Sequence, residues 1–136
     1  MNSEIDEVAG FARSCYWAPQ TKWGQDTVED EGFAVVRFKS GVWATLCMTN
    51  IDANPKRGMV EVTGTKGTFW WDYENYELTV RDGDRTVVTK GRNPPTQWEK
   101  YYANVAAHLV KGVPLVITAE WARRPIHILD LAGRSA

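Results

Sequence analysis

The sequence has little of what marks metal-binding, redox and nucleic-acid-binding proteins. Its 136 residues include two histidines and two cysteines, and the formal net charge is −1. So small a charge, with no basic stripe interleaved with aromatics, gives no field that would attract nucleic acid or an anionic membrane. His108 and His127 fall on different predicted helices and form no HxxxH or HxxE pattern, so we expect no metal site.

Paired cysteines and long apolar runs are also missing. Cys15 and Cys47 form no CxxC motif and lie among apolar residues, which predicts buried free thiols in a reducing compartment. The first residues, MNSEIDEVAG, lack the basic segment and apolar run of a signal peptide. No stretch approaches the roughly 18 apolar residues of a membrane span. We therefore expect a cytoplasmic protein.

What the sequence does contain is a heavy load of large aromatic residues. Seven Trp and five Tyr occur, and the Trp gather mainly in the strand-like first two thirds. Large aromatics on both faces of a sheet indicate that neither face is meant for water. The length fits one domain, residues 1–136.

The spacing of the apolar residues divides this domain into a strand-rich part and a helical part. Alternation with period two predicts strands between residues 6 and 90, and a helical period predicts helices at 97–111 and 119–135. Short turns such as Lys39-Ser-Gly41 and Asp82-Gly-Asp84 require antiparallel pairing, because a parallel crossover needs a dozen or more residues. The expected strands are 6–17, 32–39, 42–51, 58–64, 68–73, 77–82 and 85–90.

The ends of the predicted helices carry their own signals. Thr96 is placed to cap the first helix, which Gly112 ends, and Thr118 is placed to cap the second. Pro125 falls inside the second helix and should kink it or delay its start. The expected fold class is α+β: an open, mostly antiparallel β-sheet with two C-terminal helices packed on one face, and the other face available for association.

A glycine-flanked lysine, in Gly64-Thr-Lys-Gly67, invites comparison with a phosphate-binding loop. A Walker loop needs its lysine directly after the last glycine and a helix starting there, whose free amides face the phosphate. Here the lysine precedes the second glycine, and Phe69-Trp-Trp71, which follows, has the composition of a strand. We predict a hairpin turn and no cofactor-binding loop in this chain.

No catalytic residue can be singled out from the sequence. The serines lack the GxSxG setting of a nucleophile. The acid run Glu29-Asp-Glu31 is expected to be a solvated loop, because like charges repel. Acid–base chemistry by these carboxylates stays open as an alternative.

The ordered set of motifs resembles a known family. The set is Val28-Glu-Asp30 before a strand, a hairpin at Ser40-Gly41, a long apolar strand, the segment 60–68, then helices ending in Gly112-Val-Pro114 and Gly133-Arg-Ser-Ala136. Over nearly the whole chain this series is similar to the C-terminal domain of the Gfo/Idh/MocA family. Members are NAD(P)-dependent dehydrogenases that act on sugars, cyclitols and related polyols.

The resemblance also implies which parts of the reaction this chain does not carry. In the family a Rossmann domain with a glycine-rich loop and a catalytic lysine comes first, and the assisting His and Asp lie on a helix before the first strand of the C-terminal domain. We therefore expect no catalytic and no cofactor-binding residue here, with NAD or NADP bound by the N-terminal Rossmann domain of a full-length parent. The isolated chain should be inactive.

Candidate substrate-binding residues follow from the same resemblance. In family members the loop after the long apolar strand can reach the substrate, so Asn54, Lys56 and Arg57 are candidates to bind hydroxyls or a carboxylate. A solvated loop is the alternative. Trp17 and Trp23 are candidates for an aromatic wall against a sugar ring, with ordinary packing as the alternative.

The resemblance further implies homodimers or higher oligomers that form through the open face of the sheet. The candidates for this association face are Trp43, Thr45, Cys47 and Trp70. A register shift of one residue would move each of them to the other face. A rival interpretation is a free-standing open-sheet module that binds a ligand or partner and never had a Rossmann half; a hydrolase that uses the acid run is a weaker third.

Overall fold

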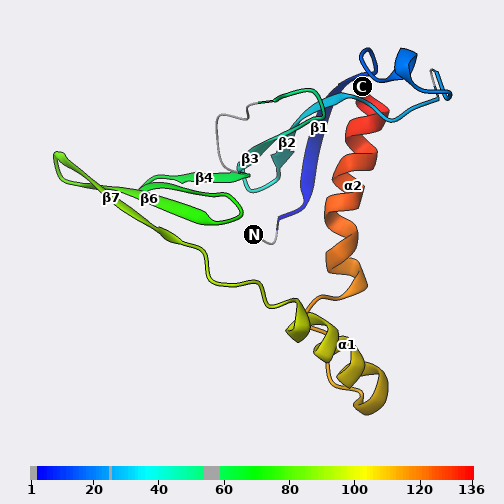
Figure 1. The fold of residues 1–136 in the computed structure, drawn as a ribbon. Coiled ribbons are helices and arrows are strands. Elements are labelled where there is room, and N and C mark those ends of the chain that lie inside the picture. The colour runs from blue at the N-terminus through cyan, green and yellow to red at the C-terminus, as the bar shows by residue number, and fades with distance from the viewer. Residues whose placement is uncertain (1–2, 25, 54–58) are drawn as a thin grey trace. The chain divides into compact units, whose positions relative to one another are not determined.

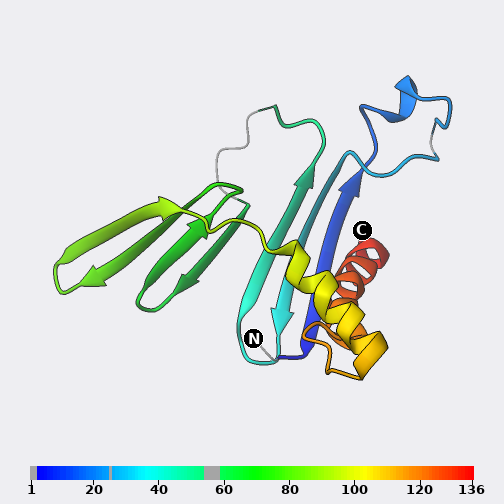
Figure 2. The same cartoon turned by 60° about the horizontal axis from the view of Figure 1, so that its bottom comes forward.

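The computed structural model describes residues 3–24, 26–53 and 59–136 (Figures 1 and 2). The chain divides into two compact units: Met1–Asp52 with Pro114–Ala136 form the first, and Ala53–Val113 form the second. The first unit holds a three-stranded sheet and one helix. The second holds a four-stranded sheet and the other helix.

The first sheet is an antiparallel meander of β1 (Ile5–Arg13), β2 (Glu31–Phe38) and β3 (Trp43–Thr49), with β2 in the centre. Gly41 turns the β2–β3 hairpin with a φ of 82°, a left-handed conformation that glycine adopts without steric cost. A short 3₁₀ turn, Ala18–Gln20, interrupts the long connection from β1 to β2. Helix α2 (Ala119–Ser135) packs against β1.

The core of the first unit lies between this sheet and α2. Val36 and Ala34 on β2 are 0% and 4% exposed. A Cβ at Gly10 on β1 would lie 2.1 Å from the carbonyl oxygen of Ala132, so only glycine allows the helix this close. The Gly10 amide donates to Ser135 Oγ at 3.1 Å, which ties the last turn of α2 to the strand.

The second sheet is a meander of β4 (Val60–Gly64), β5 (Gly67–Trp71), β6 (Asn75–Asp82) and β7 (Arg85–Arg92). The glycine-flanked lysine segment is the β4–β5 hairpin turn, with Gly64 paired to Gly67. Asp72 Oδ1 accepts hydrogen bonds from the amides of Glu74 and Asn75 and so builds the β5–β6 turn. In Figure 2 the four strands are the green to yellow-green arrows.

Helix α1 (Trp98–Lys111) belongs to the second unit and ends as predicted. Gly112 takes a φ of 67° and its amide bonds to the carbonyl of His108, the usual glycine stop of a helix. The N-cap is Gln97, without a side-chain hydrogen bond, so the prediction of a Thr96 cap was wrong. The Thr118 cap of α2 is confirmed, because its hydroxyl accepts from the amide of Trp121.

The predicted fold class is confirmed: the molecule is α+β, with open antiparallel sheets and two helices in the C-terminal part of the described chain. The strands are hydrogen-bonded into two sheets. The amide of Asn50, just after β3, bonds to the Asp30 carbonyl and continues the pairing with β2, and no ladder joins β3 to β4 among the described residues. The first strand ends at Arg13 instead of residue 17, and Pro125 lies inside α2 without delaying its start.

Candidate functional site

The face of the first sheet that points away from α2 carries exposed aromatic side chains. Register places Phe11, Phe33 and Cys47 directly opposite one another on β1, β2 and β3. The rings of Phe11 and Phe33 lie 6.4 Å apart, tilted by 33°. Phe11 is 63% and Trp43 67% exposed, so no described part of the first unit covers this face. We call it the open face.

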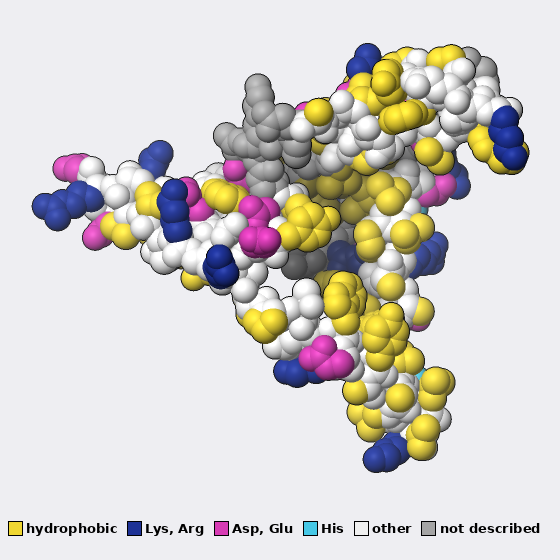
Figure 3. Space-filling view, in the orientation of Figure 1, with side chains coloured by type: hydrophobic (Ala, Val, Ile, Leu, Met, Phe, Trp, Pro, Cys, Tyr) yellow, Lys and Arg dark blue, Asp and Glu magenta, His cyan; other side chains and the backbone are white. Residues whose placement is uncertain are grey.

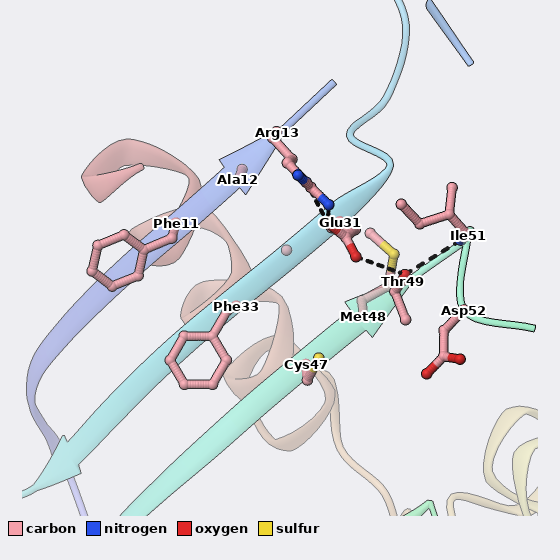
Figure 4. Close-up of a pocket in the computed structure, with 11 residues that line it drawn as sticks. Phe11, Ala12, Arg13, Glu31, Phe33, Cys47, Met48, Thr49, Ile51 and Asp52 are labelled. Carbon is pink, nitrogen blue, oxygen red and sulfur yellow. Dashed lines mark hydrogen bonds and ion pairs between the residues drawn. The ribbon is translucent and has the colours of Figure 1, made fainter. Parts of the chain in front are cut away.

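A pocket of about 630 Å³ lies at the end of the open face where β1 stops and β2 begins (Figure 4). Its apolar side is formed by Phe11, Phe33 and Cys47, and its polar side by Arg13, Glu31 and Thr49. Each of these trios forms one row across β1, β2 and β3, and the two rows are two residues apart along each strand. All six side chains therefore stand on the same face.

The polar row is hydrogen-bonded throughout. The Arg13 guanidinium pairs with Glu31 Oε2, and the hydrogen bond and charge of Glu31 raise the pKa of Arg13. Thr49 Oγ1 donates to Glu31 Oε1 at 3.2 Å and accepts from the amide of Ile51 at 3.3 Å. The row thus presents a guanidinium, a carboxylate and a hydroxyl side by side, the groups that bind hydroxyls of small polar ligands.

The loop that joins β1 to β2 is anchored by a buried carboxylate. Asp30 is 1% exposed, and its Oδ2 accepts hydrogen bonds from the amides of Cys15 and Tyr16 at 2.6 Å each. The amide of Trp17 lies 3.3 Å from Oδ1. Burial alone would raise the pKa of Asp30, but the amides of Tyr16, Cys15 and Trp17 outweigh it and hold the pKa below its ordinary value.

This anchor fixes an aromatic segment at the same end of the sheet. Tyr16 and Trp17 pack edge to face with ring centroids 4.9 Å apart, and Lys22 Nζ lies 4.4 Å from the ring centroid of Trp23. Trp17 and Trp23 remain 43% and 61% exposed. Both candidate tryptophans therefore offer free aromatic surface.

The structure brings the two predicted substrate loops to one end of the first sheet. β1 ends, β2 begins and β3 ends there, and the Asn50 amide donates to the Asp30 carbonyl at 2.8 Å. The loop that carries Trp17 and Trp23 and the loop that follows β3 thus leave the sheet side by side. Asn54, Lys56 and Arg57 lie outside the described residues.

The predicted association residues divide between the two units. Trp43, Thr45 and Cys47 alternate along β3 on the open face. Trp70 lies on β5 in the second unit, opposite Glu77 of β6 and within the polar face of that sheet. Its use for association therefore needs a different surface from that of the other three residues.

Two expectations from the sequence were wrong. The acid run is not a solvated loop, because only Glu29 among its three residues is exposed. The Asp30 carboxylate accepts hydrogen bonds from three backbone amides, and the Glu31 carboxylate pairs with Arg13. Both cysteines are exposed instead of buried. Cys15 lies in the turn held by Asp30, and Cys47 belongs to the open face, so neither reaches the core under α2.

The sequence interpretation also missed Phe11, Phe33 and Arg13. The signal was present, because period-two alternation puts these residues in phase with Trp43 and Cys47 once the hairpin register is known.

His108 is exposed and its Nδ1 donates to the Val113 carbonyl at 2.8 Å. Within the described ranges, no group of three His, Cys, Asp or Glu side chains is placed to hold a metal. No described helix is long and apolar enough to cross a membrane.

Comparisons with solved structures show the fold. An oxidoreductase from Bacillus subtilis matches 94% of this chain with a TM-score of 0.77 at 14% identity, over 42% of its own length. A protein from Desulfitobacterium hafniense, described as an NADPH-dependent oxidoreductase, matches 96% of the chain (TM-score 0.71, 16% identity, 40% of its length). Aldose–aldose oxidoreductase from Caulobacter crescentus, complexed with glycerol, matches 98% (TM-score 0.64, 14% identity, 41% of its length).

This chain therefore spans less than half the length of each of these structures. The comparison with curated proteins found no match. The model of the GFO/IDH/MocA C-terminal domain matches residues 1–70, which is more than half of the 136 residues and includes the whole of the first sheet. The chain belongs to the GFO/IDH/MocA C-terminal domain family.

Proposed function

We propose that this domain forms part of the substrate pocket of an NAD(P)-dependent oxidoreductase and holds its oligomer together. The substrate is a sugar, a cyclitol or a related polyol. The observation that carries the proposal is the convergence of two loops, the exposed Trp17 and Trp23, and a pocket with a hydrogen-bonded polar row at one end of the first sheet.

Two features support a polyol as the substrate. Sugar rings present apolar C–H faces that stack on aromatic side chains, and hydroxyls that hydrogen-bond to carboxylates and guanidinium groups. The aromatic loop and the row of Arg13, Glu31 and Thr49 offer both kinds of group. The glycerol complex of the structurally similar aldose–aldose oxidoreductase agrees with this substrate class.

The cofactor belongs, in this proposal, to a Rossmann domain of the full-length parent. The segment that most resembles a phosphate loop is the β4–β5 hairpin turn, which has no helix N-terminus to face a phosphate. One structural neighbour is described as NADPH-dependent. The parent is therefore proposed to use NAD or NADP, and the present chain to bind neither.

Association through the open face follows from its exposure. Phe11, Phe33 and Trp43 stand 63%, 42% and 67% exposed on one face of the sheet. Exposed apolar patches of this kind mark interfaces, and a second copy of the same face would cover them in a two-fold dimer.

The substrate proposal is tested by nuclear magnetic resonance of the ¹⁵N-labelled chain. We expect the indole N–H signals of Trp17 and Trp23 to shift saturably with glycerol, glucose or myo-inositol, while that of Trp98, 68% exposed in the second unit, stays in place. NADH should shift no signal at micromolar concentration. Equal shifts at all three indoles, or tight NADH binding, would contradict the proposal.

The association proposal is tested by sedimentation. Trp43→Glu should shift the chain toward monomer, because it replaces an exposed apolar ring of the open face with a charge that association would have to desolvate. Trp23→Glu, at a similarly exposed tryptophan outside the open face, is the matched control and should leave the oligomer intact. Loss of the oligomer in both variants, or in neither, would count against the open face.

A further inference from the structure

A row of polar side chains crosses the second sheet on one face. Trp70, Glu77 and Lys90 are direct cross-strand partners on β5, β6 and β7. Lys90 Nζ lies 2.9 Å from Glu77 Oε2, and Thr79 Oγ1 donates to Glu77 Oε1 at 3.3 Å. The side chain of Glu77 is 21% exposed and that of Lys90 73%. The carboxylate therefore lies low on the sheet, with the ammonium group above it.

The indole of Trp70 lies beside the same carboxylate. Trp70 is the direct cross-strand neighbour of Glu77, and its indole N–H, the one donor of the Trp side chain, is a minor cause of the lowered pKa of Glu77. The hydrogen bond from Lys90 is the main cause that holds the pKa of Glu77 below its ordinary value, so the group stays ionised at neutral pH. Glu77 thus pairs with a cation and stands next to an aromatic ring on this face.

A pocket of about 430 Å³ lies beside this row. Besides the row it is lined by Tyr76, Gly91, Asn75 and Arg92, and the last two are the next cross-strand pair on the face of the row. Each is two residues from Glu77 or Lys90 on its own strand, so both side chains stand on the face of the row.

The corner of the sheet that carries this pair is fixed by hydrogen bonds. Asn93 Nδ2 donates to the Asp72 carbonyl at 2.7 Å, and the Asn93 amide donates to the Glu74 carbonyl at 2.7 Å. These bonds join the end of β7 to the β5–β6 turn. On the other face, the ring of Tyr76 lies against Gly91, where a Cβ would be 2.6 Å from ring atoms. The backbone under Asn75 and Arg92 is therefore pre-organised.

The charges around the pocket favour an anion. Lys90 is paired with Glu77, whereas Arg92 forms no ion pair with any residue in the described part of the chain. A guanidinium group binds carboxylate or phosphate with two parallel hydrogen bonds. The partly exposed indole of Trp70 adds an aromatic surface beside it.

We propose that this pocket binds a small molecule that carries an oxyanion, a carboxylate or a phosphate, next to a ring. Arg92 binds the oxyanion, Asn75 adds a neutral hydrogen bond, and Trp70 contacts the ring. The site lies wholly in the second unit and is independent of the proposed function of the first sheet.

The test follows the indole N–H of Trp70 in ¹⁵N-labelled full chain during titration. Glucose 6-phosphate and glucuronate are the two anionic probes, and glucose is the neutral twin. We expect saturable shifts with one or both anions and binding at least about tenfold weaker with glucose, since a charge-assisted hydrogen bond is worth roughly that much. The two anionic probes separate a phosphate site from a carboxylate site.

Arginine variants decide whether Arg92 is responsible. Arg92→Gln should weaken binding about tenfold, and Arg92→Lys should weaken it less, because the charge remains while the two-pronged geometry is lost. Arg81→Gln is the matched control, since Arg81 stands on the same face of β6 at the far end of the sheet and should leave binding unchanged. The spectrum of each variant without ligand reports whether it is folded.

Three results would overturn the site. Equal weakening by Arg92→Gln and Arg81→Gln would mean general attraction to a basic surface, and that attraction would also fade with added salt. Equal affinity for glucose and both anions would mean that Arg92 does not contribute to ligand recognition. No shift with any probe would leave the row as a cross-strand ladder that only supports the edge of the sheet.

Discussion

The two units of this chain are stabilised in different ways. In the first, α2 packs on one face of a three-stranded sheet, and Val36, Ala34 and the carboxylate of Asp30 are buried. In the second, none of the described residues within 53–113 is buried, although this unit contains Phe69, Trp70 and Trp71 in one strand. Aromatic content alone therefore does not produce a core; a second layer does.

The second sheet relies on contacts between neighbouring strands. Phe69 packs on Trp71 and Tyr76 with ring centroids 5.3 and 5.8 Å apart, and Thr63 pairs with Thr68 on the other face. Such cross-strand pairs contribute roughly 0.2–1 kcal/mol each. Helix α1 carries exposed apolar side chains, which cover much of the visible surface of the helix in Figure 3. They include Leu109 and Val110, which are 78% and 80% exposed. We expect hydrogen exchange to be slowest in the first unit.

Gly10→Ala should have the largest effect on stability, because it disrupts the packing of α2 on the sheet of the first unit. The new Cβ would lie 2.1 Å from the Ala132 carbonyl oxygen, and backbone cannot move aside as a side chain can. We expect a loss of about 3 kcal/mol or more in the free energy of unfolding. Chemical denaturation measures it.

The control for this substitution is Gly32→Ala on the neighbouring strand. A Cβ at Gly32 has no atom within 4 Å, so the change should be within about 0.5 kcal/mol of neutral. If both variants lose the same stability, the contact between α2 and β1 does not distinguish the first unit.

Asp30→Asn should have the next largest effect and should be confined to the aromatic loop. The amide offers one oxygen and turns an N–H₂ group toward backbone donors, so at least one of the amides of Cys15, Tyr16 and Trp17 loses its acceptor. We expect the melting temperature to fall by about 5 °C or more. Glu29→Gln, at the exposed neighbour, should leave it unchanged.

The pH dependence provides a separate check on Asp30. Its folded pKa lies below the unfolded value, so the folded state holds fewer protons there. The stabilisation is complete above about pH 4, the usual range of an unfolded aspartate, and is lost as the pH falls through the lowered pKa. This acid-sensitive component should be missing from Asp30→Asn; an unchanged acid profile would exclude Asp30 as its source.

The sequence predicted the local elements better than their layering. Antiparallel hairpins, the Gly41 and Gly112 turns and the Thr118 cap follow from chemistry within a few residues, and all are confirmed. The split into two sheets was not predictable, because period-two alternation says which residues share a face but not which strands share a sheet. The family resemblance, confirmed over residues 1–70, came from the order of motifs.

Asp30 shows why the candidate site was only partly predictable. As one of three acids in a row it has the pattern of a solvated loop, and its burial depends on amides 13 to 15 residues earlier in the chain. Alternation did place Trp43, Thr45 and Cys47 on one face. It could not pair that face with Phe11 and Phe33 before the register of the hairpins was known.

Phe69→Ala tests the second unit, and its effect should be smaller. Phe69 is half-buried, so the loss should be about 1–2 kcal/mol instead of the 3–5 kcal/mol of a fully buried ring. Hydrogen exchange should accelerate in β4 to β7 and stay unchanged in β1 to β3. Val88→Ala, on the other face of the same sheet, is the control; equal acceleration in both sheets would mean that the two units unfold together.

The smallest effect is expected from the threonine pair of the β4–β5 hairpin. Thr63 Oγ1 and Thr68 Oγ1 lie 3.2 Å apart and are exposed, so water can replace the hydrogen bond in either single variant. A double-mutant cycle with Thr63→Val and Thr68→Val should give a coupling of about 0.5 kcal/mol or less. A coupling above about 1.5 kcal/mol would show that single cross-strand pairs hold the second sheet together. A small coupling means that the stability of this sheet is the sum of many weak contacts. Its stability then also depends on what covers its aromatic face.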